Sequence, residues 1–166
     1  MPKSILVTGA NGQLGSELQQ LAPNHPELNV TFVTRTELDL SDCTAITTWF
    51  ADKHFDVIIN CAAYTAVDTA EIELELAYGI NATAVATLAT IAKNQYSSLI
   101  HISTDYVFAG QNYRPYLETD PTDPQGVYGA SKLAGEQALL TINPAKSIII
   151  RTAWVYSKNN RGRTTV

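Results

Sequence analysis

Tyr128 and Lys132 are the residues of this 166-residue chain whose types and spacing most clearly indicate chemistry. They lie four residues apart in a segment with helical periodicity, so they would share one face of a helix, one above the other. A lysine ammonium close to a tyrosine hydroxyl stabilises the phenolate and lowers the pKa of the phenol. Such a tyrosine can give a proton to a carbonyl oxygen while a hydride reaches the carbon. Taken alone, the pair is better explained as the surface of an amphipathic helix.

Ser103 and Thr104 strengthen the catalytic interpretation, because they stand at the end of an apolar run that reads as a strand. A hydroxyl at that strand end could bond the same carbonyl oxygen from a second side and complete a small oxyanion-type site. The sequence therefore combines Thr104 with the pair Tyr128 and Lys132, and it has a glycine motif near the start of the chain. Together these features indicate a site that reduces a carbonyl group.

A glycine-rich segment, Gly9-Ala10-Asn11-Gly12-Gln13-Leu14-Gly15, directly follows the first apolar run and opens into a helical pattern. Gly9 would allow a tight turn, Gly12 would let the backbone approach a pyrophosphate, and Gly15 would permit close contact between helix and strand. The anion would lie on N–H groups at the helix N-terminus, where the helix dipole favours it. A glycine-rich turn without a ligand is the alternative, but the flanking strand and helix favour a dinucleotide site.

The end of the second apolar run bears on which dinucleotide is bound. Arg35 follows Val33 and Thr34 directly, and the first acidic residue after this apolar run is Glu37. A basic side chain there accepts a 2′-phosphate, whereas an acidic one bonds the ribose 2′-hydroxyl. NADPH is therefore favoured over NADH, although NADH stays open and Arg35 could be an ordinary surface arginine.

Further contacts to the cofactor follow from position in the chain. Asp39 and Leu40 would lie where the adenine ring packs. The small residues Cys61, Ala62 and Ala63 would let the cofactor cross the edge of the sheet, unless they serve only the packing of a helix.

The elements that must position these residues alternate along the chain between apolar, β-branched runs and helix-length segments. This alternation implies parallel strands with helices on both faces, so we predict a doubly wound α/β sheet of Rossmann type with strand order 3-2-1-4-5. The predicted NAD(P)-binding domain covers residues 1–156, and an irregular tail covers residues 157–166. Expected strands are 4–8, 30–34, 56–60, 99–103 and 147–151; expected helices are 14–21, 44–52, 74–93 and 128–140.

The segment 108–125 contains Gly110, Pro115, Pro121 and Pro124, too many breakers for a regular element. Because it follows a strand end, we expect it to be a loop over the site.

Composition narrows the function classes. Hydrophobic residues make up 45% of the chain, enough for a core, and the formal net charge of -5 argues against a nucleic-acid partner. We find no apolar run long enough to cross a membrane. The two cysteines, Cys43 and Cys61, are expected to be buried thiols of a protein in the reducing cytoplasm, without a disulfide and without a metal site.

These motifs resemble the extended short-chain dehydrogenase/reductases, and within them the branch that reduces dTDP-4-dehydrorhamnose to dTDP-L-rhamnose. The string Ser-Thr-Asp-Tyr-Val-Phe at 103–108 is the most specific match, because related epimerases and dehydratases more often carry a Ser-Ser pair followed by a different sequence. The matching segments cover nearly the whole chain in order: 9–15, 60–68, 103–108, 128–136 and 151–156.

The resemblance implies an NADPH-dependent reductase of a nucleotide-linked 4-keto-6-deoxy sugar, with Thr104, Tyr128 and Lys132 as its catalytic triad. It also gives Lys132 a hydrogen bond to the nicotinamide ribose. Tyr106 and Trp154 could instead be core aromatics. The implied cofactor contacts are Gly9, Asn11, Gly12, Gln13, Leu14, Gly15, Arg35, Asp39, Leu40, Ala62, Ala63, Tyr64, Tyr128 and Lys132; the implied substrate contacts are Val67, Thr104, Asp105, Tyr106 and Trp154.

The family continues into a C-terminal lobe that closes over the nucleotide sugar, and this chain stops before it. Activity of the chain alone therefore stays open, since substrate positioning supplies much of an enzyme's rate. A non-catalytic dinucleotide-binding subunit, such as the regulatory partner of methionine adenosyltransferase, is the alternative. The sequence also leaves open whether the chain forms a homodimer.

Overall fold

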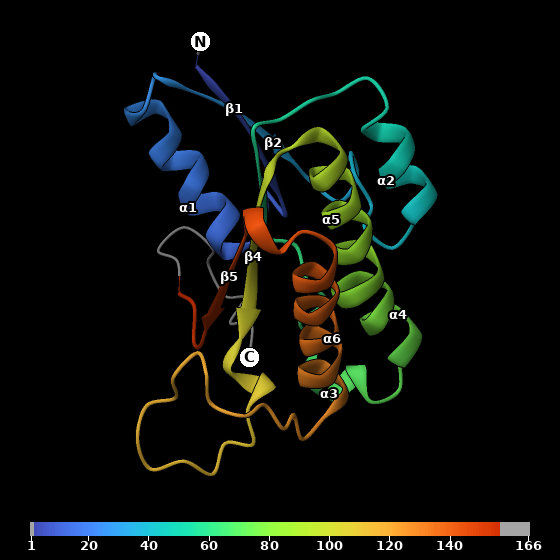
Figure 1. The fold of residues 1–166 in the computed structure, drawn as a ribbon, viewed down its shortest axis with the longest axis vertical. Coiled ribbons are helices and arrows are strands. Elements are labelled where there is room, and N and C mark those ends of the chain that lie inside the picture. The colour runs from blue at the N-terminus through green and yellow to red at the C-terminus, as the bar shows by residue number, and fades with distance from the viewer. Residues whose placement is uncertain (1, 157–166) are drawn as a thin grey trace.

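Five parallel strands form the centre of the computed structural model, which describes residues 2–156 (Figure 1). The predicted doubly wound α/β fold is confirmed. The predicted irregular tail, residues 157–166, lies outside the described residues. The strands are β1 (Lys3–Thr8), β2 (Leu28–Val33), β3 (Val57–Asn60), β4 (Ser98–Thr104) and β5 (Ser147–Thr152), in the order β2-β1-β3-β4-β5.

The expected strand order 3-2-1-4-5 is wrong in the placement of the third strand. β3 pairs with β1 on the side opposite β2, instead of lying outside β2. The residues explain the difference. Val57-Ile58-Ile59 of β3 is apolar throughout, as suits a central strand, whereas β2 exposes Asn29 and Thr31 and so suits an edge.

The helices are close to the expected segments. The segment expected as one helix over 74–93 contains a π-helical turn, and α2 ends at Trp49, before the expected end at Asp52. The short α3 was not expected. The bounds are α1 (Gln13–Leu21), α2 (Cys43–Trp49), α3 (Val67–Ala70), α4 (Leu74–Tyr78), the π turn Gly79–Thr83, α5 (Ala84–Gln95) and α6 (Val127–Ile142), with 3-10 turns at Ala22–Asn24, Asp105–Val107 and Pro144–Lys146.

The two faces of the sheet are covered unequally. α1 lies on one face, and α2, α5 and α6 lie on the other (Figure 1). The chain steps in one direction from β2 to β3, β4 and β5, and right-handed crossovers then put all the connecting helices on one side. On the less covered part of the sheet, Ile148 and Ile150 of the edge strand β5 are 55% and 45% exposed.

The continuous helix Leu74–Gln95 is long and apolar enough, by length and composition alone, to cross a membrane. The apolar runs of the sequence predicted no such segment. A core helix of a globular protein meets the same two criteria, and 33% of the apolar stretch is buried in the part of the chain that the structure describes. Its buried residues Ala84, Val85, Leu88 and Ala92 belong to the main hydrophobic cluster, together with Leu139 of α6.

A close contact between Gly135 of α6 and the π turn fixes how α6 sits. A methyl group on Gly135 would overlap with the carbonyl oxygen of Asn81. Only glycine allows this approach, which brings the face of α6 that carries Lys132 and Glu136 down onto β4.

Gly135→Ala should therefore destabilise the chain by about 1–3 kcal/mol, the usual cost of overpacking. Gly79→Ala is the matched control, because Gly79 is helical and has open space where its Cβ would be. That variant should be neutral or more stable by about 0.4–1 kcal/mol. Urea denaturation followed by circular dichroism measures both, and equal effects would contradict the packing argument.

Candidate active site

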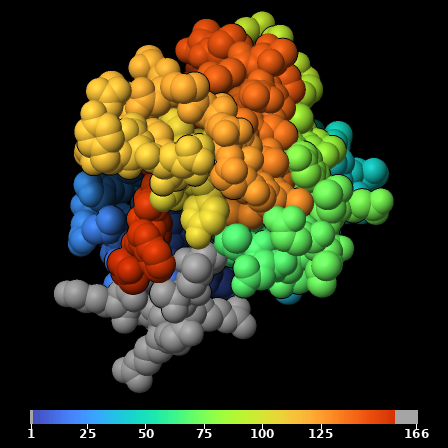
Figure 2. Space-filling view, turned by 90° about the horizontal axis from the view of Figure 1, so that it is seen from below, coloured from blue at the N-terminus to red at the C-terminus, as the bar shows by residue number. Residues whose placement is uncertain are grey.

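A cavity of about 480 Å³ opens at the edge of the sheet where the strands end. In open parallel sheets ligands bind at this edge, and the volume is in the range of small-molecule sites. Figure 2 looks onto this end, where segments far apart in the sequence gather. The described lining residues are Gly9, Asn11, Gly12, Gln13, Leu14, Arg35, Leu38, Asp39, Leu40, Cys61, Ala62, Ala63, Thr65, Ile80, Ile102, Ser103, Thr104, Asp105, Tyr106, Tyr128, Lys132, Thr152, Ala153, Trp154 and Val155.

The glycine-rich turn has the geometry expected of an anion cradle. Gly9 adopts φ +68°, and a Cβ there would lie 2.7 Å from the backbone nitrogen of Ala62. A methyl group on Gly15 would overlap with the carbonyl oxygen of Gly9, so Gly15 serves packing and does not line the cavity. Gly12 is the N-cap of α1, whose first turn contains no acidic residue. The positive end of the α1 dipole therefore lies at the cavity without a carboxylate of that turn to neutralise it.

Arg35 and Asp39 form the wall beside this turn. Arg35 Nε lies 3.4 Å from Asp39 Oδ2, and 71% of the arginine side chain is exposed. Hydrogen bonds from Ser41, chiefly from its backbone N–H, hold the pKa of Asp39 below its ordinary value. Leu38 and Leu40 are buried on either side of Asp39. The wall thus combines an accessible guanidinium with an apolar surface.

Small residues follow β3, as expected. Cys61, Ala62 and Ala63 line the cavity, and the backbone of Cys61 and Ala62 lies directly against Gly9. Burial raises the pKa of the Cys61 thiol to about 12, so this thiol stays protonated at neutral pH. Cys43 and Cys61 are both free thiols.

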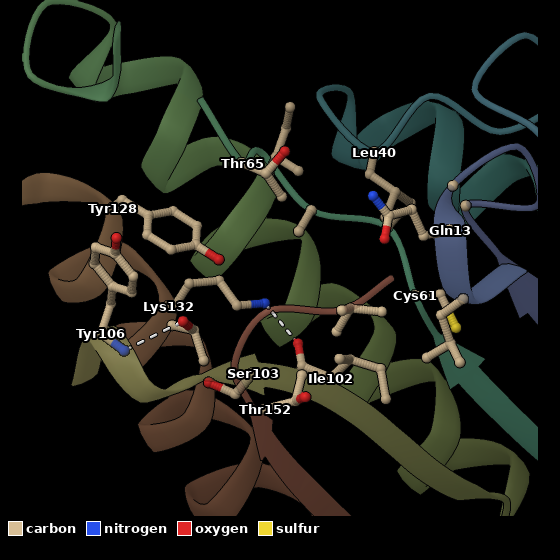
Figure 3. A pocket seen from close by; sticks show the side chains of 18 of the residues that line it. Gln13, Leu40, Cys61, Thr65, Ile102, Ser103, Tyr106, Tyr128, Lys132 and Thr152 are labelled. Atoms are coloured by element: carbon tan, nitrogen blue, oxygen red, sulfur yellow. Dashed lines mark hydrogen bonds between the residues drawn. The ribbon is translucent and has the colours of Figure 1, made fainter. Parts of the chain in front are cut away.

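Tyr128 and Lys132 lie at the other end of the cavity (Figure 3), which Thr104 also lines. Tyr128 stands in the first turn of α6, and the Thr104 hydroxyl at the end of β4 is near enough to the phenol to affect its pKa. The Thr104 hydroxyl itself donates to Asp105 Oδ1 over 3.2 Å and accepts from the backbone N–H of Tyr106 over 3.2 Å. The ring of Tyr106 packs edge-on against Tyr128, with centroids 5.5 Å apart. Burial raises the pKa of Tyr128 above its ordinary value, although the Thr104 hydroxyl acts in the opposite direction. The phenol is therefore protonated at neutral pH.

Lys132 lies one turn after Tyr128 on α6, and only 1% of the residue is exposed. Its Nζ donates a hydrogen bond of 2.7 Å to the carbonyl oxygen of Ile102 and lies 3.3 Å from Nε2 of His101. Burial lowers the pKa of Lys132 to about 8, against the opposing field of Glu136. The expectation that Lys132 lowers the pKa of Tyr128 is wrong in this structure, because burial of the phenol dominates and the bonds of Nζ go to β4.

Ser103 has a different role from Thr104. Its hydroxyl donates to Glu136, which is buried on α6, and Arg151 of β5 donates a bond of 2.6 Å to the same carboxylate. This bond is the main reason why the pKa of Arg151 is raised. The group ties β4, α6 and β5 together behind the cavity, so of the two hydroxyls only that of Thr104 influences Tyr128.

Most of the predicted site residues line one cavity, but three do not: Gly15, Tyr64 and Val67. Tyr64 is turned away, since its backbone N–H and C=O bond the Asn81 side chain and its hydroxyl donates to Glu73 over 2.7 Å. Val67 begins α3.

The loop at 108–125 lines the cavity with none of its residues, so its expected position over the site is wrong. Phe108 stacks on Tyr116 within the loop, and Asp123 donates a backbone bond to Val107. Arg151 of β5 lies 4.9 Å from the centre of the Phe108 ring and donates to the carbonyl oxygen of Glu118, which holds the loop against β5.

Sequence reasoning assigned no role in the site to several lining residues: Leu38, Thr65, Ile80, Ile102, Thr152, Ala153 and Val155. The last three flank Trp154, so the segment 151–156 was the available signal. Trp154 itself is 62% exposed and adopts φ +51°, a backbone conformation that is unusual for a non-glycine residue.

Comparisons with known proteins agree with this geometry. A family model described as the RmlD substrate binding domain matches residues 3–166. A dTDP-4-dehydrorhamnose reductase of Mycobacterium tuberculosis is 46% identical over 157 residues, which are 92% of this chain and 50% of the relative. The chain thus spans about half the length of the curated relatives it matches.

Solved structures give the same result. A dTDP-4-dehydrorhamnose reductase of Clostridium acetobutylicum is 43% identical with a TM-score of 0.88, covering 96% of this chain and 56% of that one. The reductase of Bacillus anthracis, solved in complex with NADP, is 39% identical with a TM-score of 0.87, covering 94% and 55%.

The buried ammonium of Lys132 predicts a pH dependence of stability. The pKa is about 8 in the folded chain and 10.5 as an ordinary value. Between these values the unfolded chain binds the proton that the folded chain has released, so stability rises with pH. Relative to Lys132→Met, the wild-type free energy of unfolding should increase by roughly 3 kcal/mol across this window, at about 1.36 kcal/mol per pKa unit.

Urea unfolding at several pH values measures this difference. Lys93→Met, which removes an exposed lysine of α5, is the control and should show no such rise. A wild-type advantage over Lys132→Met that does not change with pH would contradict the burial of a titrating ammonium.

Proposed function

Because the chain belongs to the family of the RmlD substrate binding domain, we propose that it is the dinucleotide-binding and catalytic half of an NADPH-dependent reductase of dTDP-4-dehydrorhamnose. One observation carries the proposal: Thr104, Tyr128 and Lys132 converge at one end of a cavity whose other end is the glycine-rich N-terminus of α1. A reacting carbonyl and a pyrophosphate therefore have separate places in one site. The product would be dTDP-L-rhamnose.

NADPH fits the residues present. The N-terminus of α1 at Gly12 would hold the pyrophosphate, where a side chain would narrow the approach. Arg35 would bond the 2′-phosphate, and the adenine would lie against Leu38 and Leu40. The related reductase of Bacillus anthracis is described as a complex with NADP, which supports this choice. NADH stays open as a second cofactor because Asp39 competes for the guanidinium.

When bound, NADPH supplies a hydride to the keto carbon of the sugar. Tyr128 would donate its proton to the keto oxygen as negative charge develops there. Its raised pKa suits this direction of reaction, since a protonated phenol is a donor. Thr104 would bond the same oxygen, and Lys132 would bond the nicotinamide ribose from below.

Substrate contacts are proposed for Thr104, Asp105, Tyr106 and Trp154, which line the cavity; all but Thr104 are exposed at its mouth. Exposed aromatic rings give area for stacking on a sugar or base. Tyr64 and Val67 are left out of this set because they do not line the cavity.

A binding-only subunit remains the second interpretation of the sequence. The reductase is favoured because a binding module has no need for a buried lysine that lines the same cavity as a tyrosine and a threonine hydroxyl. The free thiols Cys43 and Cys61 agree with the reducing cytoplasm that we propose as its location.

Arg35→Ala should weaken NADPH far more than NADH. A charge-assisted bond to phosphate contributes roughly 1.5–3 kcal/mol, so the preference should change by about ten- to a hundredfold. Fluorescence titration of both cofactors measures it. Arg114→Ala, an exposed arginine outside the cavity, is the control. An equal loss of affinity for NADPH and NADH would show that Arg35 does not bind the 2′-phosphate.

Tyr128→Phe tests the reductase itself, in a protein completed with the remaining length of its relatives. The change keeps the ring and removes the proton, so kcat for NADPH oxidation with dTDP-4-dehydrorhamnose should fall by about 10²–10⁴-fold while cofactor affinity stays near normal. Tyr113→Phe, on a fully exposed ring of the loop 108–125, is the matched control. A kcat within a fewfold of wild type would contradict the role of Tyr128 and favour the binding subunit.

A further inference from the structure

A row of buried polar side chains crosses the sheet and ends at Lys132. Thr8 of β1, Asn60 of β3 and His101 of β4 occupy paired register positions and are 2%, 1% and 0% exposed. Thr8 Oγ1 donates to Asn60 Oδ1 over 2.7 Å, and Asn60 Nδ2 lies 3.1 Å from His101 Nδ1. His101 Nε2 then faces Lys132 Nζ at 3.3 Å.

This row has no part in the proposed hydride and proton transfer, and the backbone pairing of β1, β3 and β4 does not depend on polar side chains at these positions. Buried polar groups weaken a sheet unless every hydrogen bond is made, and an apolar side chain would fill each position. The row places the imidazole directly beside a lysine that lines the cavity. The presence of a buried histidine at position 101 is therefore best explained by its effect on Lys132.

The hydrogens of the row can be counted. Burial, and after it the charge of Lys132, hold the pKa of His101 well below its ordinary value, so the ring is neutral and has one N–H and one lone pair. With Asn60 Nδ2 donating to Nδ1, the ring hydrogen is on Nε2. An Nε2–H can pair only with a lone pair on Nζ, and hence with the neutral amine of Lys132.

In the second arrangement the Asn60 amide is turned over, the ring hydrogen is on Nδ1 and Lys132 is an ammonium. Oδ1 then accepts from Nδ1–H, and Nε2 accepts from the ammonium of Lys132. Thr8 tolerates both arrangements, because a hydroxyl can donate to Oδ1 or accept from Nδ2. In both arrangements Nζ keeps its bond to the Ile102 carbonyl.

We propose that His101 is the positioning residue of Lys132, and that its tautomer, set together with the Asn60 amide, follows the protonation state of Lys132. Passing from amine to ammonium takes up one proton: Nζ gains the Nε2 hydrogen and Nδ1 gains one from solvent. The meaning of this coupling for catalysis rests on the proposed function of Lys132, whereas the coupling itself does not.

Few other titrating groups lie close enough to His101 and Lys132 to cause a pH-dependent change of the His101 tautomer. On α6 they are Glu136, already paired with Arg151 of β5, and the phenol of Tyr128. Asp105 and Tyr106 lie beside Tyr128, and Cys61 follows Asn60 with its pKa raised to about 12. Lys132 is the one whose pKa, about 8, predicts a change near neutral pH.

Nitrogen-15 NMR of the imidazole rings in the 166-residue chain tests the proposal. The chain contains three histidines, so the background variant His25→Gln/His54→Gln leaves His101 as the only ring observed. As the pH rises through about 8, the protonated nitrogen should change from Nδ1 to Nε2. A His101 that keeps one tautomer throughout overturns the proposal.

Three variants identify the cause of that change. Lys132→Arg, which stays charged, should hold the Nδ1–H form at every pH, and Lys132→Met should abolish the pH dependence. Asn60→Asp leaves Lys132 in place and presents an oxygen to Nδ1 in either orientation, so it should lock Nδ1–H as well. A wild-type titration curve in Lys132→Met or in Asn60→Asp also overturns the proposal.

The NADPH-induced rise in melting temperature of the same samples keeps the two proposals separate. If the tautomer does not follow pH while NADPH still binds, the coupling fails and the proposed function stands. If the tautomer follows pH in a chain that binds no dinucleotide, the coupling stands and the proposed function fails.

Discussion

The burial of the Lys132 side chain is the constraint on which the rest of the site depends. A buried ammonium lowers the stability of a protein unless hydrogen bonds and nearby charge offset the loss of water. Here the partners are the Ile102 carbonyl and His101, and the carboxylate of Glu136 adds a favourable field. Perturbed lysines of this kind cluster at functional sites, because the energy they cost is retained only where the group is used.

Much of the surrounding structure serves to bring that lysine to the edge of the sheet. Gly135 lets α6 approach the π turn, and Glu136 clamps α6 to β5 through Arg151. The parallel sheet supplies the other half of the arrangement, because all its strands end at one edge. The glycine turn after β1 and the threonine that ends β4 therefore line the same cavity although nearly a hundred residues separate them.

Local patterns predicted what depends on nearby residues, namely the glycine cradle at Gly9, the strands and most of the cavity lining. The strand order was wrong because the pairing of β3 with β1 joins segments about fifty residues apart, and the alternation of strands and helices does not reveal which strands pair. The pKa of Tyr128 and the partners of Lys132 were missed for a related reason. His101 lies in an ordinary apolar run, and only the register of β1, β3 and β4 brings Asn60 beside it.

The central claim, that this chain contains a complete dinucleotide site, is tested most directly by its melting temperature in the presence of NADPH. A ligand that binds only the folded state adds about 2.7 kcal/mol at a hundredfold excess over Kd, so the melting temperature should rise clearly. Gly12→Val, at a position with ordinary backbone angles, should remove the rise and keep the fold, whereas Gly79→Val should keep both. A folded wild-type chain whose melting temperature does not change at millimolar NADPH or NADH would contradict the account.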